Sequence, residues 1–141
     1  MIEIKSAHTL EEIREIFKGD RFATEACNAV ILEADVFRAK VEMEILPIHR
    51  NAWGGVMGGA IFTLADFAMA VASNGYREEC DTCGVDANIF YVKPPKGSKL
   101  FAEAKCVKPG KILSFYEVTV TDDLGTDVAH FSGKTYTMQK K

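Results

Sequence analysis

Hydrophobic and polar residues alternate most regularly between positions 37 and 45. The apolar set is Phe37, Ala39, Val41, Met43 and Ile45, and charged side chains fill the positions between them. A period of two predicts a strand with one face buried and one face in water. A shorter apolar run at 29–32 precedes it, and we expect a turn between the two at 34–35.

Four further strand-like runs follow in the second half of the chain, at about 84–92, 100–107, 112–121 and 127–138. The segments that join them, 93–98, 108–111 and 122–125, are rich in Pro, Gly, Asp and Lys, which favour turns. Because such links are short, we expect each strand to pair with the next in antiparallel fashion.

Between the two groups of strands, the pattern changes to that of a buried helix. Glycines at 54, 55, 58 and 59 lead into a run at 56–72 that is apolar on nearly every side. One narrow strip is small or polar, with members three and four residues apart: Gly59, Thr63, Asp66, Ala70 and Ser73. The run is too short and too interrupted for a membrane span.

A second, shorter helix is predicted near the start of the chain, at about 9–18. Thr9 with Glu12 three residues later forms a capping box, and the apolar residues that follow trace one face. Two strands, a buried helix and four strands indicate an α+β chain, in which a single antiparallel sheet could bury the helix by curling around it. At 141 residues we expect a single domain, 1–141, with its core at about 28–138.

Composition narrows the functional classes. A net charge of −3 gives no general reason to bind nucleic acid, and the first residues lack the layout of a signal peptide, so we expect a cytoplasmic protein. Histidines and carboxylates show no metal-ligand spacing, and we expect no metal. Cys80 and Cys83 form one C-x-x-C, which could indicate a redox pair or half of a zinc site. Because no second cysteine pair follows, we interpret them, with Cys27 and Cys106, as free thiols.

Three groups in the loop and the buried helix could take part in catalysis. The main-chain N–H of Gly58 lies where a helix start leaves donors unpaired, a natural place for a developing negative oxygen. Asp66 could act as a general base or a nucleophile. A carboxylate among apolar residues is costly unless it is paired, hydrogen-bonded or protonated, and sequences tend to accept that cost where chemistry requires it. Asn51 offers an amide that both donates and accepts. The simpler interpretation is that Asp66 is only the charged residue of a solvent-facing strip on the helix.

Geometry constrains how Gly58 and Asp66 act together. Eight residues separate them, about 12 Å along a helix at roughly 1.5 Å per residue. An oxyanion donor and a base must each lie about 3 Å from the reacting atoms. One helix is therefore unsuited to supply both, whereas two copies related by a twofold axis could. We expect a homodimer.

The same residues resemble the signature H-x-N-x-x-G-x-x-H-G-G, followed by F-T-L-A-D, of hotdog-fold acyl-CoA thioesterases of the phenylacetate-degradation type. Here the signature is carried by His49, Asn51, Gly54, Met57, Gly58 and Gly59, and then by Phe62 to Asp66. The resemblance implies a hotdog fold, a sheet wrapped around one long helix. It also implies hydrolysis of an acyl-CoA thioester by a dimer, or a dimer of dimers, that needs no cofactor beyond the coenzyme A of its substrate.

Carried over from that family, the Gly58 N–H polarises the thioester carbonyl, and Asp66 of the partner activates water or attacks the carbonyl. Asn51 orients the water or the substrate. The remaining candidates for substrate binding are His49, Met57, Gly59, Thr63, Lys93, Lys96, Lys108 and Lys111, with the lysines holding the nucleotide end. Phe62, Met69, Ile89 and Tyr91 are candidates for the acyl pocket.

One departure from the family pattern keeps other functions open. Met57 replaces the second histidine of the signature, and a thioether cannot make the hydrogen bonds of an imidazole. A non-catalytic acyl-CoA or fatty-acyl binding protein is therefore the main alternative. A hydratase or dehydratase that uses His49 with Asp66 is a weaker one, and His49 could instead simply fix its loop.

Overall fold

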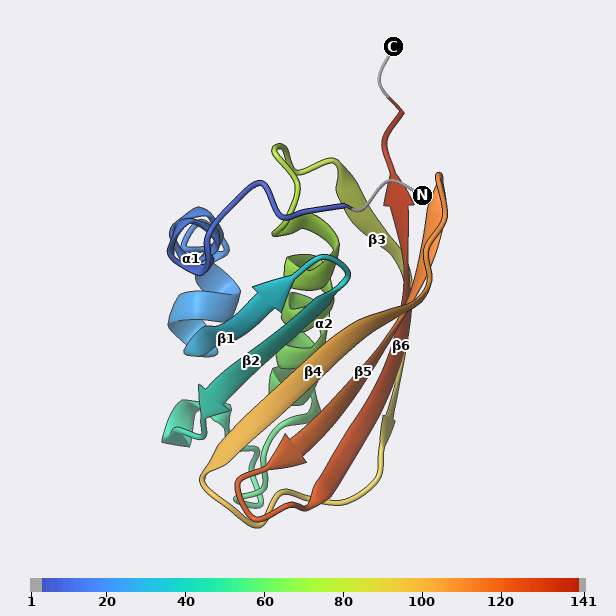
Figure 1. Ribbon diagram of the computed structural model, residues 1–141. Helices are drawn as coiled ribbons and strands as arrows, with labels where there is room; N and C mark the ends of the chain where they lie inside the picture. The colour runs from blue at the N-terminus through green and yellow to red at the C-terminus, as the bar shows by residue number, and fades with distance from the viewer. Residues whose placement is uncertain (1–3, 140–141) are drawn as a thin grey trace.

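The computed structural model describes residues 4–139 and shows one antiparallel sheet of six strands folded around a long helix (Figure 1). The helices are α1 (Leu10–Phe17), the π-helix η1 (Phe22–Ala26), the 3₁₀ turn η2 (Pro47–His49) and α2 (Gly58–Asn74). The strands are β1 (Ala29–Asp35), β2 (Arg38–Glu44), β3 (Thr82–Tyr91), β4 (Lys99–Lys108), β5 (Leu113–Asp122) and β6 (Asp127–Thr137). The predicted α+β hotdog architecture is confirmed.

The order of strands in the sheet is β1-β2-β4-β5-β6-β3. The expectation that short links join neighbours holds for β4–β5 and β5–β6 but is wrong for β3 and β4, because β3 pairs with β6. The connection at 92–98 passes the ends of two strands instead. Three strand spacings are only about 14 Å, and seven extended residues span about 23 Å, so the link is long enough.

The turn between β1 and β2 also differs from expectation. It lies at Val36 and Phe37 rather than at 34–35, and Phe37 adopts a left-handed φ of 64° that is rare for a bulky residue. A tertiary contact accounts for this conformation, since the Phe37 ring packs edge-on against Tyr76 with centroids 5.3 Å apart. A contact between residues so far apart in the chain leaves no local signal.

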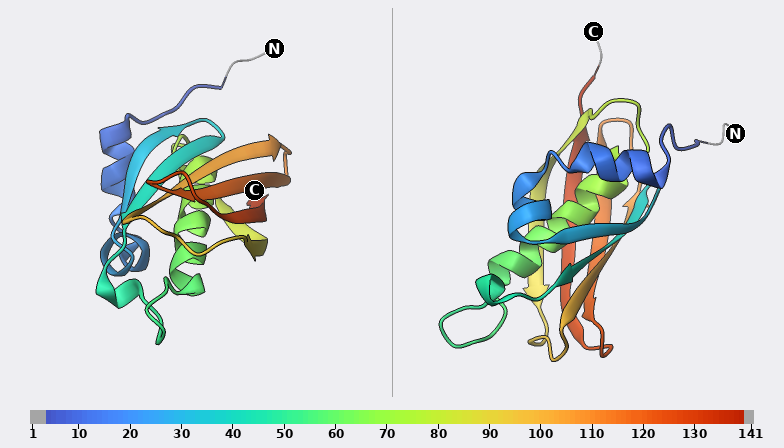
Figure 2. Two further views of the ribbon diagram at one scale, coloured as in Figure 1. Left: turned by 90° about the horizontal axis from the view of Figure 1, so that it is seen from below. Right: turned by 90° about the vertical axis from the view of Figure 1, so that its left-hand side faces the viewer.

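Helix α2 lies against one face of the sheet and contacts all six strands (Figures 1 and 2). Its buried side chains meet the inward positions of the strands, among them Ala39, Val41 and Met43, as the alternation of β2 predicts. Small residues allow the close approach. At Gly133 a Cβ atom would lie 2.6 Å from the Met69 sulfur, so the helix packs there directly on the backbone of β6. None of the helices within residues 4–139 has the length and apolarity that a membrane crossing requires.

The N-terminal helix forms as predicted. Thr9 Oγ1 accepts from the Glu12 N–H at 3.2 Å, and Glu12 Oε1 accepts from the Thr9 N–H at 3.0 Å, which completes the capping box. Phe17 then packs edge-on against Phe67 of α2. This contact brings the segment after α1, which carries η1, alongside the middle of α2.

Strand β3 is the exposed edge of the sheet. From Cys83 to Tyr91 every residue except the half-buried Ile89 is exposed, although β3 pairs with β6 along its length. A strand with one face fully on a core alternates between buried and exposed positions, so within one chain α2 covers only a small part of β3. Within residues 4–139 its outer edge pairs with no strand.

Candidate active site

Helix α2 begins at Gly58 without a side-chain cap, so its first N–H groups point away from the helix without an intrahelical acceptor. Met57 is the residue before the helix and is 58% exposed. Tyr91 of β3 packs on the helix start, where its O–H donates to the Gly58 carbonyl at 2.9 Å. A Cβ at Gly58 would lie 3.0 Å from the end of the Tyr91 side chain, so any larger residue at this position would displace the ring slightly. Tyr91 thereby holds the helix tip in place.

Two cavities flank this tip. The larger, which we call the apolar cavity, has a volume of about 590 Å³ and its wall includes Phe22, Ile48, Met57, Gly59, Phe62, Thr63 and Tyr91. The smaller, the loop cavity, has a volume of about 340 Å³ and is lined by Asn51, Gly58, Tyr91, Lys93 and Pro94 among others. Tyr91 lines both cavities, and space is open next to the Cα of Gly59. Of the predicted acyl-pocket residues, Phe62 and Tyr91 reach a cavity, whereas Met69 is buried in the core.

His49 fixes the loop before α2. It is 4% exposed; its Nδ1 accepts from the Leu46 N–H at 3.0 Å, and its Nε2 donates to the Ala26 carbonyl at 2.8 Å. The Met57 N–H also donates to the His49 carbonyl at 2.8 Å. Both ring nitrogens are thus engaged, which leaves none to exchange a proton with a substrate. The hydratase alternative loses its support, and His49 contributes to the apolar cavity only as part of its wall.

Asn51 folds the loop that follows. Its Oδ1 accepts from the N–H groups of Trp53 and Gly55, both at 3.0 Å, while the Asn51 N–H donates to the Gly55 carbonyl at 2.7 Å. The side-chain oxygen is therefore occupied within the loop. The amide still lines the loop cavity beside Gly58, where its Nδ2 group can donate to a bound molecule.

Asp66 lines a third cavity, which we call the acid cleft. It has a volume of about 320 Å³ and lies between α2 and the segment around η1. Its lining is Asp20, Arg21, Phe22, Ala23, Thr63, Asp66, Phe67 and Ala70. Asp66 is exposed at the mouth of this cleft, yet desolvation by its neighbours, followed by the nearby Asp20 carboxylate, raises the pKa of Asp66. Arg21 does not offset this effect, because its guanidinium pairs with Glu25 at 2.8 and 2.9 Å. A raised pKa suits a carboxylate that must accept a proton.

The structure places Gly58 and Asp66 on the same helix at the predicted spacing, so one chain does not bring them to one carbonyl. The strip of which Asp66 is part is open to solvent at Gly59 and Asp66 and half-open at Thr63 and Ala70. Ser73 is not part of it; this residue is buried and accepts from the Thr82 hydroxyl at 3.0 Å. Thr63 donates to the Gly59 carbonyl within the helix.

The predicted lysines separate into two groups. Lys93 lines the loop cavity, and Lys96 lies in the same connection between β3 and β4. Lys108 and Lys111 lie at the other end of β4, about 30 Å away along ten strand residues. Within one chain only the first group is close to the helix tip.

A buried carboxylate anchors the loop that carries Lys93 and Lys96. Asp122, 3% exposed at the end of β5, accepts from the N–H groups of Lys96 and Gly97 through Oδ2 and of Leu124 and Thr126 through Oδ1. Burial opposes its ionisation, but these donors outweigh burial and hold the pKa of Asp122 well below its usual range. The lysine loop is therefore held in a defined position next to the helix tip.

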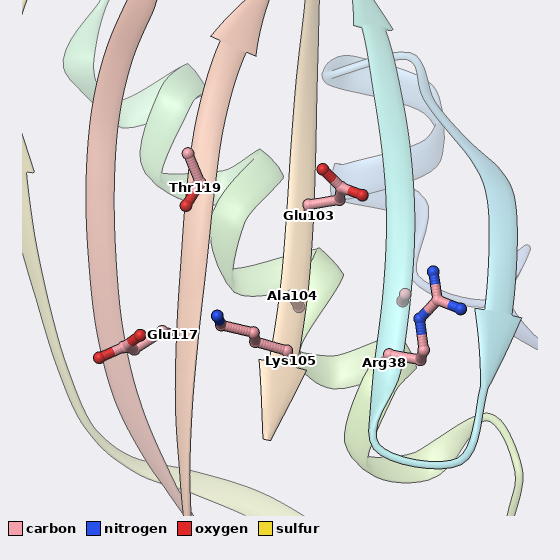
Figure 3. Close-up of a pocket in the computed structure, with 7 residues that line it drawn as sticks. Arg38, Glu103, Ala104, Lys105, Glu117 and Thr119 are labelled. Atoms are coloured by element: carbon pink, nitrogen blue, oxygen red, sulfur yellow. The ribbon is translucent and has the colours of Figure 1, made fainter. Parts of the chain in front are cut away.

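Other candidate chemistry lies outside this region. Within the described residues no group of His, Cys, Asp and Glu could hold a metal ion. Cys27 lines the apolar cavity, but burial raises the pKa of its thiol despite a contact with the Thr63 hydroxyl, so it is a poor nucleophile at neutral pH. A further pocket lies on the sheet face opposite α2, where Arg38, Glu103, Lys105, Glu117 and Thr119 project from β2, β4 and β5 (Figure 3).

Two features of the site were not predicted from the sequence. One is the hydrogen bond from Tyr91 to Gly58, and the other is the position of Asp20 near Asp66. Both join residues more than thirty positions apart. The exposure of Phe22 was also not predicted. This bulky apolar residue is 69% exposed in the segment after α1, which suggests a role at a surface.

Comparison with known families identifies the family of this chain. A model of the thioesterase superfamily matches residues 54–129, which include the start of α2, Asp66 and the lysine loop. The chain belongs to the thioesterase superfamily, and the resemblance to hotdog-fold thioesterases is confirmed. The prediction that the protein is a thioesterase is confirmed at the level of the family.

Individual relatives span nearly the same length. A candidate esterase of Archaeoglobus fulgidus is 34% identical over 94% of this chain and 85% of its own. Human acyl-coenzyme A thioesterase 13 is 29% identical over 79% of this chain and 81% of its own.

Solved structures repeat the fold. The PaaI protein of the Escherichia coli phenylacetic acid degradation operon superposes with a TM-score of 0.81 over 94% of this chain and 95% of its own, at 22% identity. A Streptococcus mutans protein bound to acetyl CoA superposes with a TM-score of 0.73 over 81% of this chain and 91% of its own, at 26% identity.

Proposed function

We propose that this protein hydrolyses acyl-CoA thioesters at a site shared by two copies of the chain. The acyl group occupies the apolar cavity, and the pantetheine arm leaves through the loop cavity toward Lys93 and Lys96. The Gly58 N–H of one copy and Asp66 of the other face the same carbonyl. The name of the human relative and the acetyl CoA bound to the Streptococcus mutans neighbour support this class of substrate.

One observation carries the proposal. An uncapped helix start opens between two cavities, and a carboxylate with a raised pKa lies two turns farther along the same helix in a separate cleft. The two halves of a hydrolytic site are both present, but they are about 12 Å apart in one chain. A twofold axis that reverses the direction of α2 brings the tip of one helix to the Asp66 of the other.

The free edge of β3 is a suitable surface for two copies of the chain to meet across such a twofold axis. Val85 and Phe90 are 55% and 68% exposed on this strand, and the edge has unpaired backbone groups. Proteins rarely leave such an edge uncovered, because it invites pairing with another strand. If two copies of β3 pair antiparallel, their sheets join into one, and the two α2 helices lie antiparallel on the same face of it.

Hydrolysis at this site proceeds with Asp66 taking a proton from water while the water oxygen attacks the thioester carbon. The carbonyl oxygen becomes negative and accepts from the Gly58 N–H, where the positive end of the helix favours it. The C–S bond then breaks, and the CoA sulfur leaves as a thiolate that takes up the proton. In the alternative route Asp66 attacks the carbon itself and forms an anhydride that water cleaves.

The apolar cavity predicts which acyl groups react. Its lining contains no Lys or Arg among the described residues, so a second carboxylate on the acyl chain would be buried without a partner. We expect octanoyl-CoA and phenylacetyl-CoA to be hydrolysed with a kcat/KM at least about tenfold higher than that of succinyl-CoA. Release of free thiol measures all three. Absence of thiol release from the whole panel would contradict the proposed function.

Because the Asp20 carboxylate lies near Asp66, we expect it to affect the pH dependence of kcat/KM. Because Asp66 must be ionised to act, the acid limb of the kcat/KM profile lies above the range of an ordinary aspartate, in the direction of the raised pKa of Asp66. Asp20→Asn removes a negative charge from the acid cleft, so the pKa of Asp66 falls and the limb moves to lower pH. Glu103→Gln, on the sheet face opposite α2, removes the same charge outside the acid cleft and serves as control. A limb that stays in place would exclude Asp20 as an influence on the base.

A binding protein without turnover is the second candidate, favoured by Met57 in place of the family histidine. The structure shows Met57 at the wall of the apolar cavity, where a thioether fits an acyl chain. Stabilisation of the protein by acyl-CoA without thiol release would support this candidate.

A further inference from the structure

The chain has one tryptophan, and the structure holds it almost fully in solvent. Trp53 is 93% exposed at the tip of the loop between η2 and α2, which projects from the body of the molecule in Figure 2. Burying an indole ring contributes a large favourable free energy, which an exposed tryptophan does not provide. Exposed tryptophans are therefore typical of binding surfaces.

The loop is built to present this side chain rather than left to move freely. Besides the bonds made by Asn51, the Gly54 N–H donates to the Asn51 carbonyl at 3.0 Å, and Arg50 donates to the Gly54 carbonyl at 2.9 Å. Gly54 has a φ of 82°, a conformation that favours glycine, and Arg50 pairs with Val56 across a short bridge. A closed, hydrogen-bonded loop carries the indole at its tip.

The position of the loop indicates what the indole meets. Asn51 and Gly55 of this loop form one wall of the loop cavity, and Lys93 with Pro94 and Pro95 forms another. The loop contributes a cation at Arg50, and the facing connection contributes Lys93 and Lys96. An exposed indole on a loop that carries one cation, opposite a connection that carries two more, matches a purine base that carries phosphates.

From this geometry we infer that Trp53 is the platform on which the adenine of coenzyme A stacks, with Arg50 and Lys93 near its phosphates. The inference rests on the proposed function for the identity of the ligand. It adds a binding residue for the nucleotide end of the substrate, far from the carbonyl that reacts. Trp53 therefore contributes to substrate affinity and takes no part in the chemical step.

Kinetics with two substrates separate nucleotide binding from chemistry. Octanoyl-pantetheine keeps the thioester but lacks the adenine nucleotide. For Trp53→Ala we expect the KM for octanoyl-CoA to rise roughly tenfold or more, with kcat unchanged, and the KM for octanoyl-pantetheine to stay at the wild-type value. Trp53→Phe retains a smaller ring and should recover part of the affinity. Ile112→Ala, an exposed apolar residue at the opposite end of β4, is the matched control.

Fluorescence tests the contact directly, because Trp53 is the only indole in the chain. We expect free CoA and 3′-phospho-ADP to quench the emission of the wild-type protein saturably, and pantetheine not to quench it. Equal quenching by pantetheine, or an unchanged KM for octanoyl-CoA in Trp53→Ala, would overturn the inference. So would an emission maximum that shifts to the blue with protein concentration or on addition of phospholipid vesicles, since a second copy or a membrane would then cover Trp53.

The two proposals fail in different ways. If the wild-type protein releases no thiol from any acyl-CoA, the proposed function fails, and quenching by CoA still tests Trp53. If the wild-type protein is active and Trp53→Ala has the same KM, only the inference about Trp53 fails.

Discussion

Asp66→Asn is expected to lower kcat for octanoyl-CoA on the order of a thousandfold, the usual contribution of a general base or nucleophile. The amide has nearly the same shape as the carboxylate but cannot take a proton from water. Thiol release under saturating substrate measures the loss. Asp35→Asn, at the turn between β1 and β2, should leave kcat unchanged.

The same substitution should make the protein more stable at neutral pH. Since the pKa of Asp66 is raised in the folded chain, its stabilising contribution is present below the ordinary pKa of an aspartate and is lost as pH rises through the raised value. Asparagine carries no charge to desolvate, so the Tm of Asp66→Asn at pH 7 is expected above that of the wild type. A variant as active as the wild type would remove Asp66 from the mechanism. A Tm below that of the wild type would contradict the desolvation of Asp66 in the folded chain.

Gly58→Pro is the second substitution with a large expected effect, because it deletes the main-chain N–H that the proposal assigns to the oxyanion. Proline is well tolerated at the first position of a helix, and Met57 already has φ −63° and ψ 133°, the extended conformation required before proline. Loss of one oxyanion donor is expected to lower kcat by about 10²–10³-fold with a smaller effect on KM.

The matched control is Gly58→Ala. Both variants place a Cβ about 3.0 Å from the Tyr91 ring, so both disturb that contact, but alanine keeps the N–H group. The ratio of their kcat values therefore reports the donor alone. Equal kcat values for the two variants would show that the Gly58 N–H does not stabilise the transition state.

Features set by local pattern could be predicted from the sequence. The period of two in β2, the apolar run of α2 and the capping box of α1 each depend on residues a few positions apart, and each formed where expected. The glycine pair at the helix start and the spacing from Gly58 to Asp66 are likewise local.

Features set by contacts between distant segments could not be predicted. The place of β3 beside β6 depends on pairing between residues far apart in the chain, for example Asn88 with Ser132. The left-handed Phe37 depends on Tyr76, and the separation of Lys108 from Lys93 depends on the direction of β4. The hydrophobic pattern of each strand is compatible with several orders of the strands in the sheet, so only the assembled sheet distinguishes them.

The central claim is that each site takes its oxyanion donor from one chain and its acid from another, and a mixed dimer tests it most directly. Chains carrying Asp66→Asn and Gly58→Pro are co-expressed with different affinity tags, and the dimer that contains one of each is isolated in two steps. Such a dimer has one site with both groups intact and one site with neither. The account therefore predicts about half of the wild-type kcat per dimer, although each parent retains only about a hundredth of it or less. Activity no higher than that of the parents, or failure to recover any mixed dimer from a protein that proves monomeric, would contradict the account.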